Sequence, residues 1–236
     1  MANYNRVVLK LSGEQFQGQR ENGIDAEFLH WIAAEIKKTV SIGTDVIIIV
    51  GGGNLIRGES FSKNGIERTT ADYMGMLATI MNGMALTDVL EQNDQPTRLM
   101  TRLSASSVAE PYIRRRALRH LEKGRVVIIA GGTGNPFVTT DTGAVLAASE
   151  LAAEAVLKAT KVDGVYDKDP AQHNDAIKQD EMSINDAIAD ENVKVMDKAA
   201  LAMAQEQNLD IIVFNLKDEG NIAKAASGER IGTKVS

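Results

Sequence analysis

Short runs of apolar, mostly β-branched residues alternate along this chain with longer segments in which apolar residues recur every three or four positions. Runs of this composition are typical of strands that are covered on both faces. They lie at 7–11, 46–50, 98–100, 126–130, 155–159 and 211–214. Alternation of short strands with helix-length segments predicts an α/β fold with a mainly parallel sheet.

Three of the intervening segments carry clear helical signals. Asp25 precedes a segment with Phe28, Ile32 and Ile36 on one side, so we expect it to cap a helix. A second helix is predicted from Pro111 to Gly124, since proline favours helix starts and glycine favours their ends. Within it we interpret four arginines as a solvated helix face, with a role in ligand binding as the alternative; they are Arg114, Arg115, Arg116 and Arg119.

The third helical segment, 70–90, is apolar over more than one stripe of its surface. Such a helix is buried on two sides, either inside the core or at a subunit interface that methionine helps to fill. The pattern alone favours neither alternative. The apolar residues are Tyr73, Met74, Met76, Leu77, Ile80, Met81, Met84, Leu86 and Val89.

Composition narrows the class of protein. The chain has 236 residues, 44% of them hydrophobic, which suits one large domain or two closely joined lobes. A net charge of −6 argues against binding to nucleic acid or anionic membranes. The absence of cysteine excludes disulfides and fits a reducing compartment. Segment 1–14 has a short apolar run broken by Lys10, so we expect no signal peptide or membrane span and a cytoplasmic location.

Two glycine runs follow predicted strands, at 51–53 and 131–134. Glycine lets backbone N–H groups approach a phosphate, and ligands of open α/β sheets bind beyond the carboxyl ends of the strands. Tight turns are the alternative, but two such runs favour a phosphate site. A P-loop is excluded because Glu59 stands where its lysine belongs. The dinucleotide spacing fails too, because Ile56 and Phe137 occupy its third glycine position.

The cation that such a phosphate site needs must come from elsewhere. Lys10 lies at the end of the first predicted strand and is followed at once by Ser12 and Gly13. Lysine in an apolar run is costly to bury without a partner, so it either snorkels to water or serves a site. The turn that follows favours a role for Lys10. Lys158 and Lys161 end another strand, and no histidine spacing indicates a protein metal site.

Six motifs occur in order over nearly the whole chain: VVLKLSGE, VGGGNLIRG, ADYMGMLATIMNGMAL, GTGNPFVTTDT, LKATKVDGVYDKDP and VKVMDKAA. Together they resemble the bacterial UMP kinases (uridylate kinases), a family of the amino acid kinase superfamily. The resemblance implies a three-layer αβα sandwich with a mainly parallel central sheet. It also implies transfer of the ATP γ-phosphoryl group to UMP in pyrimidine and CTP biosynthesis, with Mg²⁺ carried by ATP. Members form homohexamers, which favours the interface interpretation of 70–90.

The resemblance assigns site residues within a single domain, 1–236. The lobe at about 1–155 is expected to hold UMP, and the lobe at about 156–236 the ATP base, with the polar stretch 167–180 as an exposed loop between lobes. The residues expected at ATP are Lys10, Leu11, Ser12, Gly13, Gly53, Arg57, Thr160, Tyr166 and Asp169. Those expected at UMP are Gly52, Asp72, Thr133, Gly134, Asn135, Pro136, Phe137, Val138, Thr139 and Thr140.

Catalysis is assigned by the resemblance to four residues. Lys10, Arg57 and Lys161 are the expected cations on the phosphates, while Asp141 orients the lysines or the magnesium shell. A further segment corresponds to a region linked with activation by GTP, but its form departs from the commonest pattern. This departure leaves open whether GTP activates and UTP inhibits the protein. The segment comprises Gly18, Gln19, Arg20, Glu21, Asn22 and Gly23.

Particular residues oppose two other functions. A kinase acting on a carbamate or carboxylate is opposed by Asp72 together with the GTGNPFVTTD motif. A non-catalytic nucleotide-binding or oxyanion-storage protein is opposed by the joint retention of the four residues assigned to catalysis.

Overall fold

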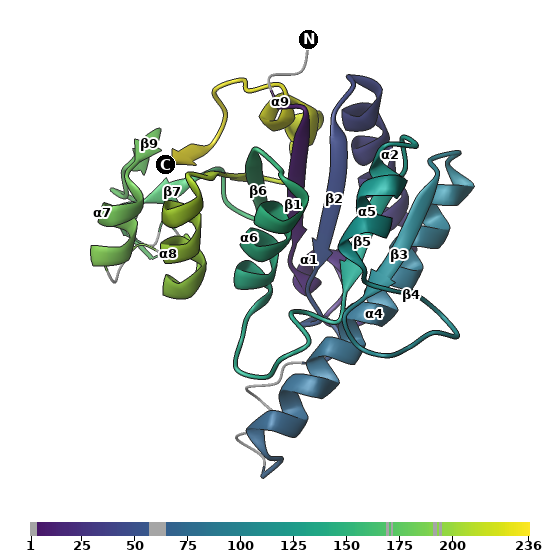
Figure 1. Ribbon diagram of the computed structural model, residues 1–236. Helices are drawn as coiled ribbons and strands as arrows, with labels where there is room; N and C mark the ends of the chain where they lie inside the picture. Colours follow the sequence, from purple (N-terminus) through teal and green to yellow (C-terminus); the bar gives the residue numbers. More distant parts are fainter. Residues whose placement is uncertain (1–3, 57–64, 169, 171, 191–192, 194) are drawn as a thin grey trace.

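A nine-stranded sheet runs through the centre of the molecule in the computed structural model, which describes residues 4–56, 65–168, 170, 172–190, 193 and 195–236 (Figure 1). The strand order is β4-β3-β5-β2-β1-β6-β10-β11-β9. The bounds are β1 Arg6–Leu11, β2 Asp45–Val50, β3 Thr97–Thr101, β4 Glu110–Pro111, β5 Val126–Ala130, β6 Ala155–Thr160, β9 Glu181–Met182, β10 Asp210–Asn215 and β11 Thr233–Val235. A separate antiparallel pair joins β7 (Val165–Tyr166) to β8 (Lys178–Gln179).

Neighbouring strands of the large sheet run parallel except for β10 and β11. The predicted parallel α/β fold is therefore confirmed, and each of the six predicted strands is present within one residue of its expected ends. Because the strands are parallel, the carboxyl ends of β1, β2, β5 and β6 meet at one edge of the sheet.

Helices cover both faces of the sheet and complete the expected three layers. One face carries α1 (Gly13–Phe16), α2 (Ala26–Ser41), α4 (Arg68–Gln92) and α9 (Asn221–Ala226). The other carries α5 (Arg114–Leu121), α6 (Thr140–Leu151), α7 (Ile184–Ala189) and α8 (Lys198–Gln207).

Side chains of a strand alternate between the two faces, and β1 shows what this does for the site. Val7 and Leu9 enter the core beneath α2, whereas Val8 enters the core beneath α6 and α8. Lys10 follows Val8 with a period of two, so its side chain faces α6.

Helix boundaries follow local chemistry with one correction. Asp25 caps α2 as predicted, because its side chain accepts a hydrogen bond from the Phe28 backbone N–H at 3.2 Å. The prediction that the next helix starts at Pro111 is wrong, since α5 begins at Arg114. Pro111 instead pairs with Thr101 in the edge strand β4, where a missing N–H is tolerated.

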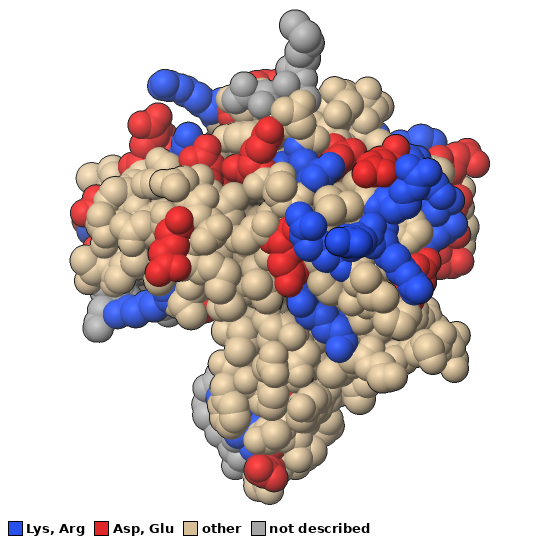
Figure 2. Space-filling model, in the orientation of Figure 1, with Lys and Arg blue, Asp and Glu red and all other residues tan. Residues whose placement is uncertain are grey.

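The exposed arginines of α5 form a basic patch on the surface (Figure 2). Arg119 pairs with Glu122 one turn along the chain, which fits the predicted solvated helix face. Segment 167–180 is not purely a loop, because it contributes β8 to the small hairpin. Among the described helices, none is long and apolar enough to cross a membrane.

Candidate active site

The first glycine run lies where β2 ends, and its lack of side chains is required by the chain itself. A Cβ on Gly13 would lie 2.3 Å from the backbone nitrogen of Gly53, and one on Gly52 would lie 2.6 Å from the carbonyl oxygen of Gly75. The turn after β1, the loop after β2 and α4 therefore touch backbone to backbone. Gly53 differs, because a Cβ built there meets nothing within 4 Å. Its backbone is the part of this loop that a phosphate could approach.

The second glycine run reverses the chain between β5 and α6. Gly131 and Gly132 adopt left-handed backbone angles, with φ of 78° and 56°. The Gly131 N–H donates to the Thr79 hydroxyl of α4 at 2.8 Å, which ties this loop to the helix that the first loop also touches. Both loops thus border one helix, α4, at the carboxyl edge of the sheet.

Between the loops lies a buried cluster of three charged residues. The Asp141 carboxylate contacts Lys10 Nζ through one oxygen at 2.8 Å and Lys158 Nζ through the other, also at 2.8 Å. The side chains are only 9%, 15% and 15% exposed for Lys10, Asp141 and Lys158. Lys158 also donates to the Val195 carbonyl oxygen. The cluster therefore holds two fixed cations beside one anion at the ends of β1 and β6.

The ionisation of the cluster follows from burial and from the three charges. Burial alone raises the pKa of Asp141, but the attraction of Lys10 and Lys158 outweighs it and holds that pKa below its usual value. Burial lowers the pKa of Lys158, which Asp141 partly opposes and Lys10 reinforces. Lys158 therefore loses its proton at lower pH than an ordinary lysine, and the carboxylate stays charged throughout the neutral range.

The turn after β1 is locked against β6 by a residue that the sequence analysis did not assign. The Ser12 N–H donates to Gln15 Oε1 at 2.8 Å, and Gln15 Nε2 donates to the Ala159 carbonyl oxygen at 2.7 Å. The signal was present, because Ser followed by Gln at the third position forms a capping box. Leu11 is fully buried, so only its backbone could face a ligand.

A small cavity of 170 Å³ lies beside α4 and gathers half of the residues expected at UMP. Those on its wall are Gly52, Asp72, Val138, Thr139 and Thr140. Asp72 accepts from Arg68 Nε at 2.9 and 3.0 Å and from the Phe137 N–H at 2.8 Å. Asp72 therefore pins the second loop to α4.

The remaining residues expected at UMP do not line this cavity. Phe137 is 67% exposed, has a left-handed φ of 66° and lies 5.7 Å from the Arg68 guanidinium. The others outside the cavity wall are Thr133, Gly134, Asn135 and Pro136.

The residues expected around the ATP base lie farther along the same edge. Thr160 ends β6, and its hydroxyl contacts the Val162 carbonyl oxygen at 2.6 Å. The Tyr166 hydroxyl donates to Asp163 at 2.6 Å. Lys161 is 55% exposed and pairs with Glu14 at 3.3 Å, so it lies outside the buried cluster. Arg57 and Asp169 fall outside the described residues.

Lys158, rather than Lys161, is the lysine that joins Lys10 at Asp141. Lys10 and Lys158 are direct partners in the parallel register of β1 and β6, which points both side chains at the same face. The signal in the sequence was the alternation Val156, Lys158, Thr160, which repeats the spacing of Val8 and Lys10. The register between two strands far apart in sequence was needed to use it.

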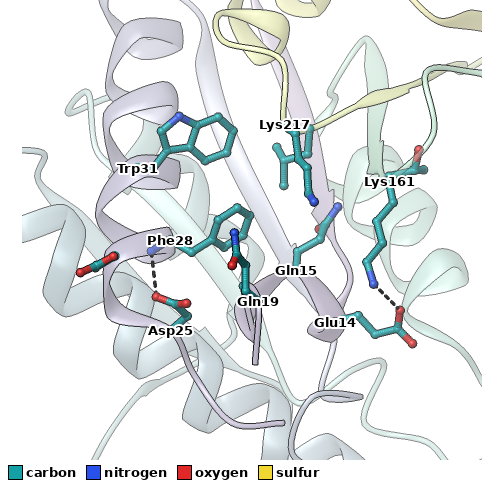
Figure 3. A pocket seen from close by; sticks show the side chains of 12 residues that line it. Glu14, Gln15, Gln19, Asp25, Phe28, Trp31, Lys161 and Lys217 are labelled. Atoms are coloured by element: carbon teal, nitrogen blue, oxygen red, sulfur yellow. Dashed lines mark hydrogen bonds and ion pairs between the residues drawn. The ribbon is translucent and has the colours of Figure 1, made fainter. Parts of the chain in front are cut away.

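A cavity of about 570 Å³ lies against the α2 face (Figure 3). Phe28 and Trp31 stack at 5.4 Å on one wall, and Lys161 and Lys217 stand opposite. Gln15 and Thr160 also line it, so the cavity borders both the turn after β1 and the end of β6.

The segment expected to respond to GTP borders this cavity in part. Gly18 and Gln19 line it. The segment ends at Gly23, whose N–H donates to the Asn54 carbonyl oxygen at 3.0 Å, and Asn54 Nδ2 donates back at 2.8 Å. Asn54 also exchanges hydrogen bonds with Asn82 of α4, which links the segment to the first glycine loop. Arg20, Glu21 and Asn22 lie at the exposed or partly exposed surface between these points.

No group of three His, Cys, Asp or Glu side chains that could hold a metal ion occurs in the described part of the chain.

Comparison with known proteins adds a family and several solved structures. Residues 5–215 match the model of the amino acid kinase family. The structure of UMP kinase from Bacillus anthracis superposes with a TM-score of 0.95 at 41% identity, over 99% of this chain and 96% of that one. UMP kinase from Ureaplasma parvum gives 0.91 at 33% identity, over 98% of both chains. Uridylate kinase from Archaeoglobus fulgidus gives 0.76 at 28% identity, over 98% and 99%.

Proposed function

Because the chain belongs to the amino acid kinase family, we propose that it transfers the γ-phosphoryl group of ATP to UMP, giving UDP and ADP. The observation that carries this proposal is the buried Lys10–Asp141–Lys158 cluster between two glycine loops. A UMP phosphate oxygen attacks the γ-phosphorus while the bond to the β–γ bridging oxygen breaks. The negative charge then moves onto ADP.

The geometry suits this reaction because phosphoryl transfer asks little covalent chemistry of a protein. It requires in-line placement of the two phosphates and fixed charges around the transferred group. Lys10 and Lys158 supply two such cations, and Asp141 holds both without reorganisation during transfer. No general base is needed, because the attacking phosphate oxygen is already ionised.

The two substrates divide between the lobes. UMP enters the cavity beside α4, where Gly52, Asp72 and Thr140 supply a backbone N–H, a carboxylate and a hydroxyl. ATP places its phosphates at Ser12, Gly13 and Gly53, with Arg57 as an additional cation. Its base lies towards Thr160, Tyr166 and Asp169. In this assignment about 1–155 form the acceptor lobe and about 156–236 the lobe for the ATP base.

Magnesium fits the site as an ion carried by ATP. Asp141 Oδ1 is buried with the Lys10 ammonium at 2.8 Å, and a carboxylate oxygen has a second lone pair for a further donor. A water molecule on the magnesium ion could donate to this oxygen. When bound, the ion neutralises charge on the phosphates of ATP. Asp141 would orient its water shell rather than replace it.

An assay of ADP release with different acceptors tests the function. We expect release with Mg-ATP and UMP, and only background release with a carbamate, an amino-acid carboxylate or no acceptor. Equal release with a carboxylate would assign the chain to another kinase of the superfamily. Binding of ATP without release under any condition would support the non-catalytic alternative.

We also propose that the protein assembles as a homo-oligomer, and as a hexamer, through α4. This helix extends beyond the sheet, and the surface over its protruding half carries few charges on the face shown (Figures 1 and 2). Four large apolar side chains on it are at least 41% exposed and repeat every three or four positions, which makes one uncovered stripe. They are Tyr73, Leu77, Met81 and Met84.

Met81→Asp should therefore dissociate the assembly. Met81 is 55% exposed in the single chain, and burying a methionine side chain is worth about 1.5–3 kcal/mol, so a charge there opposes association. Sedimentation velocity measures the change. Ile177→Asp is the matched control, because Ile177 is 64% exposed on the polar segment before β8. A wild-type monomer at micromolar concentration would contradict the proposal.

GTP activation and UTP inhibition belong to the same proposal, with the 570 Å³ cavity as the place where an effector acts on the turn after β1. Phe28 and Trp31 could stack on a base, and Lys217 could meet a phosphate. Trp31→Ala should abolish at least one nucleotide response while the rate without effector stays within about twofold. Steady-state rates with and without GTP or UTP measure it, and an unchanged response would remove the cavity from regulation.

The absence of cysteine fits a cytoplasmic location.

A further inference from the structure

Asp197 is a carboxylate that none of the site assignments above includes. It lies directly before α8 and caps that helix, accepting from the Ala200 N–H at 2.9 Å. The other hydrogen bonds of its side chain are made to residues outside α8. Asp197 accepts from the hydroxyls of Thr139 and Thr142, the latter at 2.9 and 3.0 Å, and both belong to the start of α6. A helix cap needs neither of these contacts.

The contact with Thr139 leads to the charged cluster in one step. Thr139 is the N-cap of α6, and its hydroxyl oxygen accepts from the Asp141 N–H at 3.0 Å. A hydroxyl that gives its hydrogen to Asp197 is fixed with its lone pairs towards Asp141. The chain of contacts runs from Asp197 through Thr139 to the backbone of Asp141, the residue whose carboxylate holds Lys10 and Lys158.

The same segment reaches the cluster by a second route. Lys158 donates to the carbonyl oxygen of Val195, two residues before Asp197. Lys158 faces Lys10 from β1, Asp141 from α6 and Asp197 from the start of α8. Lys158 therefore interacts with two carboxylates among the described residues: Asp141, which touches it directly, and Asp197, which acts on it without a hydrogen bond.

We propose that Asp197 is a positioning residue for phosphoryl transfer, which fixes the backbone of Asp141 through Thr139 and adds a second negative charge near Lys158. This inference rests on the proposed kinase function. It explains why one side chain bridges α6 and α8 at the site, since both helices must hold the same cluster.

The variant Asp197→Asn keeps the size of the side chain and can still cap α8, but it removes the charge. Without that charge, burial and Lys10 act on Lys158 with less opposition, so the pKa of Lys158 falls further. Because Lys158 then loses its proton at lower pH, the alkaline limb of the pH profile of kcat should also move to lower pH. A looser Asp141 should also lower kcat by about 10–10², with a smaller change in KM for ATP.

Three matched variants separate positioning from folding. Asp197→Glu keeps the charge but displaces the carboxylate, so it should lower kcat and leave the alkaline limb in place. Ser183→Ala removes the cap of the nearby helix α7, where Ser183 accepts from the Asp186 N–H, and should lower Tm without moving the limb. Thr139→Val breaks the relay while Asp197 still caps α8. If Asp197→Asn does not fold, Thr139→Val tests the inference in its place. We then expect Thr139→Val to have a lower kcat than the wild-type protein at saturating UMP.

A titration of the Lys158 side chain by NMR, assigned with Lys158→Arg, reads the effect without activity. We expect Lys158 to titrate at lower pH in Asp197→Asn than in the wild-type protein. If the wild type has no UMP-dependent turnover but the titration shifts, the proposed function fails and the role of Asp197 at Lys158 stands. A folded Asp197→Asn with wild-type kcat, pH profile and Lys158 titration would overturn the inference, as would a folded Thr139→Val of normal kcat.

Discussion

UMP should be phosphorylated with a kcat/KM on the order of 10⁴ above that of CMP. Uracil presents a carbonyl oxygen where cytosine presents an amino group, so donors and acceptors are exchanged on that edge. The cavity beside α4 offers the hydroxyl of Thr140 and the backbone of the second glycine loop. Groups that pair with uracil there would remain buried and unpaired against cytosine. The measurement is kcat/KM for each acceptor at fixed Mg-ATP.

The deoxyribose analogue provides an internal control for this prediction. Asp72 is the carboxylate on the wall of the same cavity, and it could accept a hydrogen bond from a ribose hydroxyl. The sugar of dUMP lacks the 2′-hydroxyl and therefore has one donor fewer. We therefore expect dUMP to be poorer than UMP but to keep the base preference. Comparable kcat/KM values for UMP and CMP would indicate a broad pyrimidine kinase and would remove the assigned role of 133–140.

Replacing Lys10 by alanine should leave the protein folded but lower kcat on the order of 10²–10³. Lys10 is a preorganised cation at the carboxyl end of β1, held at 2.8 Å from Asp141 in a side-chain environment only 9% exposed. Its loss leaves Asp141 paired with Lys158, so the carboxylate keeps a partner and the core keeps its charge balance. The measurement is kcat at saturating ATP and UMP, with circular dichroism to check folding.

Two further lysines make this experiment decisive. Lys37→Ala is the control, because Lys37 donates to the Asn93 carbonyl oxygen at the surface and lies far along α2 from the cluster. Lys161→Ala tests the role expected from the sequence for that residue. Near-normal turnover of Lys10→Ala would remove Lys10 from the site, and a loss in Lys161→Ala as large as in Lys10→Ala would keep Lys161 as a catalytic cation beside Lys158.

Local chemistry predicted most of the fold because each signal was complete within one segment. The six apolar strands needed no knowledge of their partners, and Asp25 could cap its helix from three residues away. The helix start at Pro111 failed because proline serves helix starts and edge strands equally well. Pro111 lies in an edge strand because it pairs with Thr101, and the proline alone does not reveal that partner.

The site was predictable only as far as its signals were local. Two glycine runs and the turn after Lys10 indicated a phosphate site, although Gly13 and Gly52 prove to be required by backbone contacts within the protein. The choice of Lys158 depended on its register with Lys10. The links of Asp197 to α6 depended on how α8 packs against that helix. Tertiary contacts of this kind leave no periodic signal in a single sequence.

At the buried lysine–aspartate cluster, a phosphoryl group should pass directly from ATP to UMP. The most direct test follows ATP labelled at the γ-phosphorus through a single turnover with excess enzyme. We expect the label in the β-phosphate of UDP only when UMP is present, and we expect Lys10→Ala to slow its appearance by a factor on the order of 10²–10³. Label released as inorganic phosphate at the same rate with and without UMP, or transfer at the wild-type rate in Lys10→Ala, would contradict it.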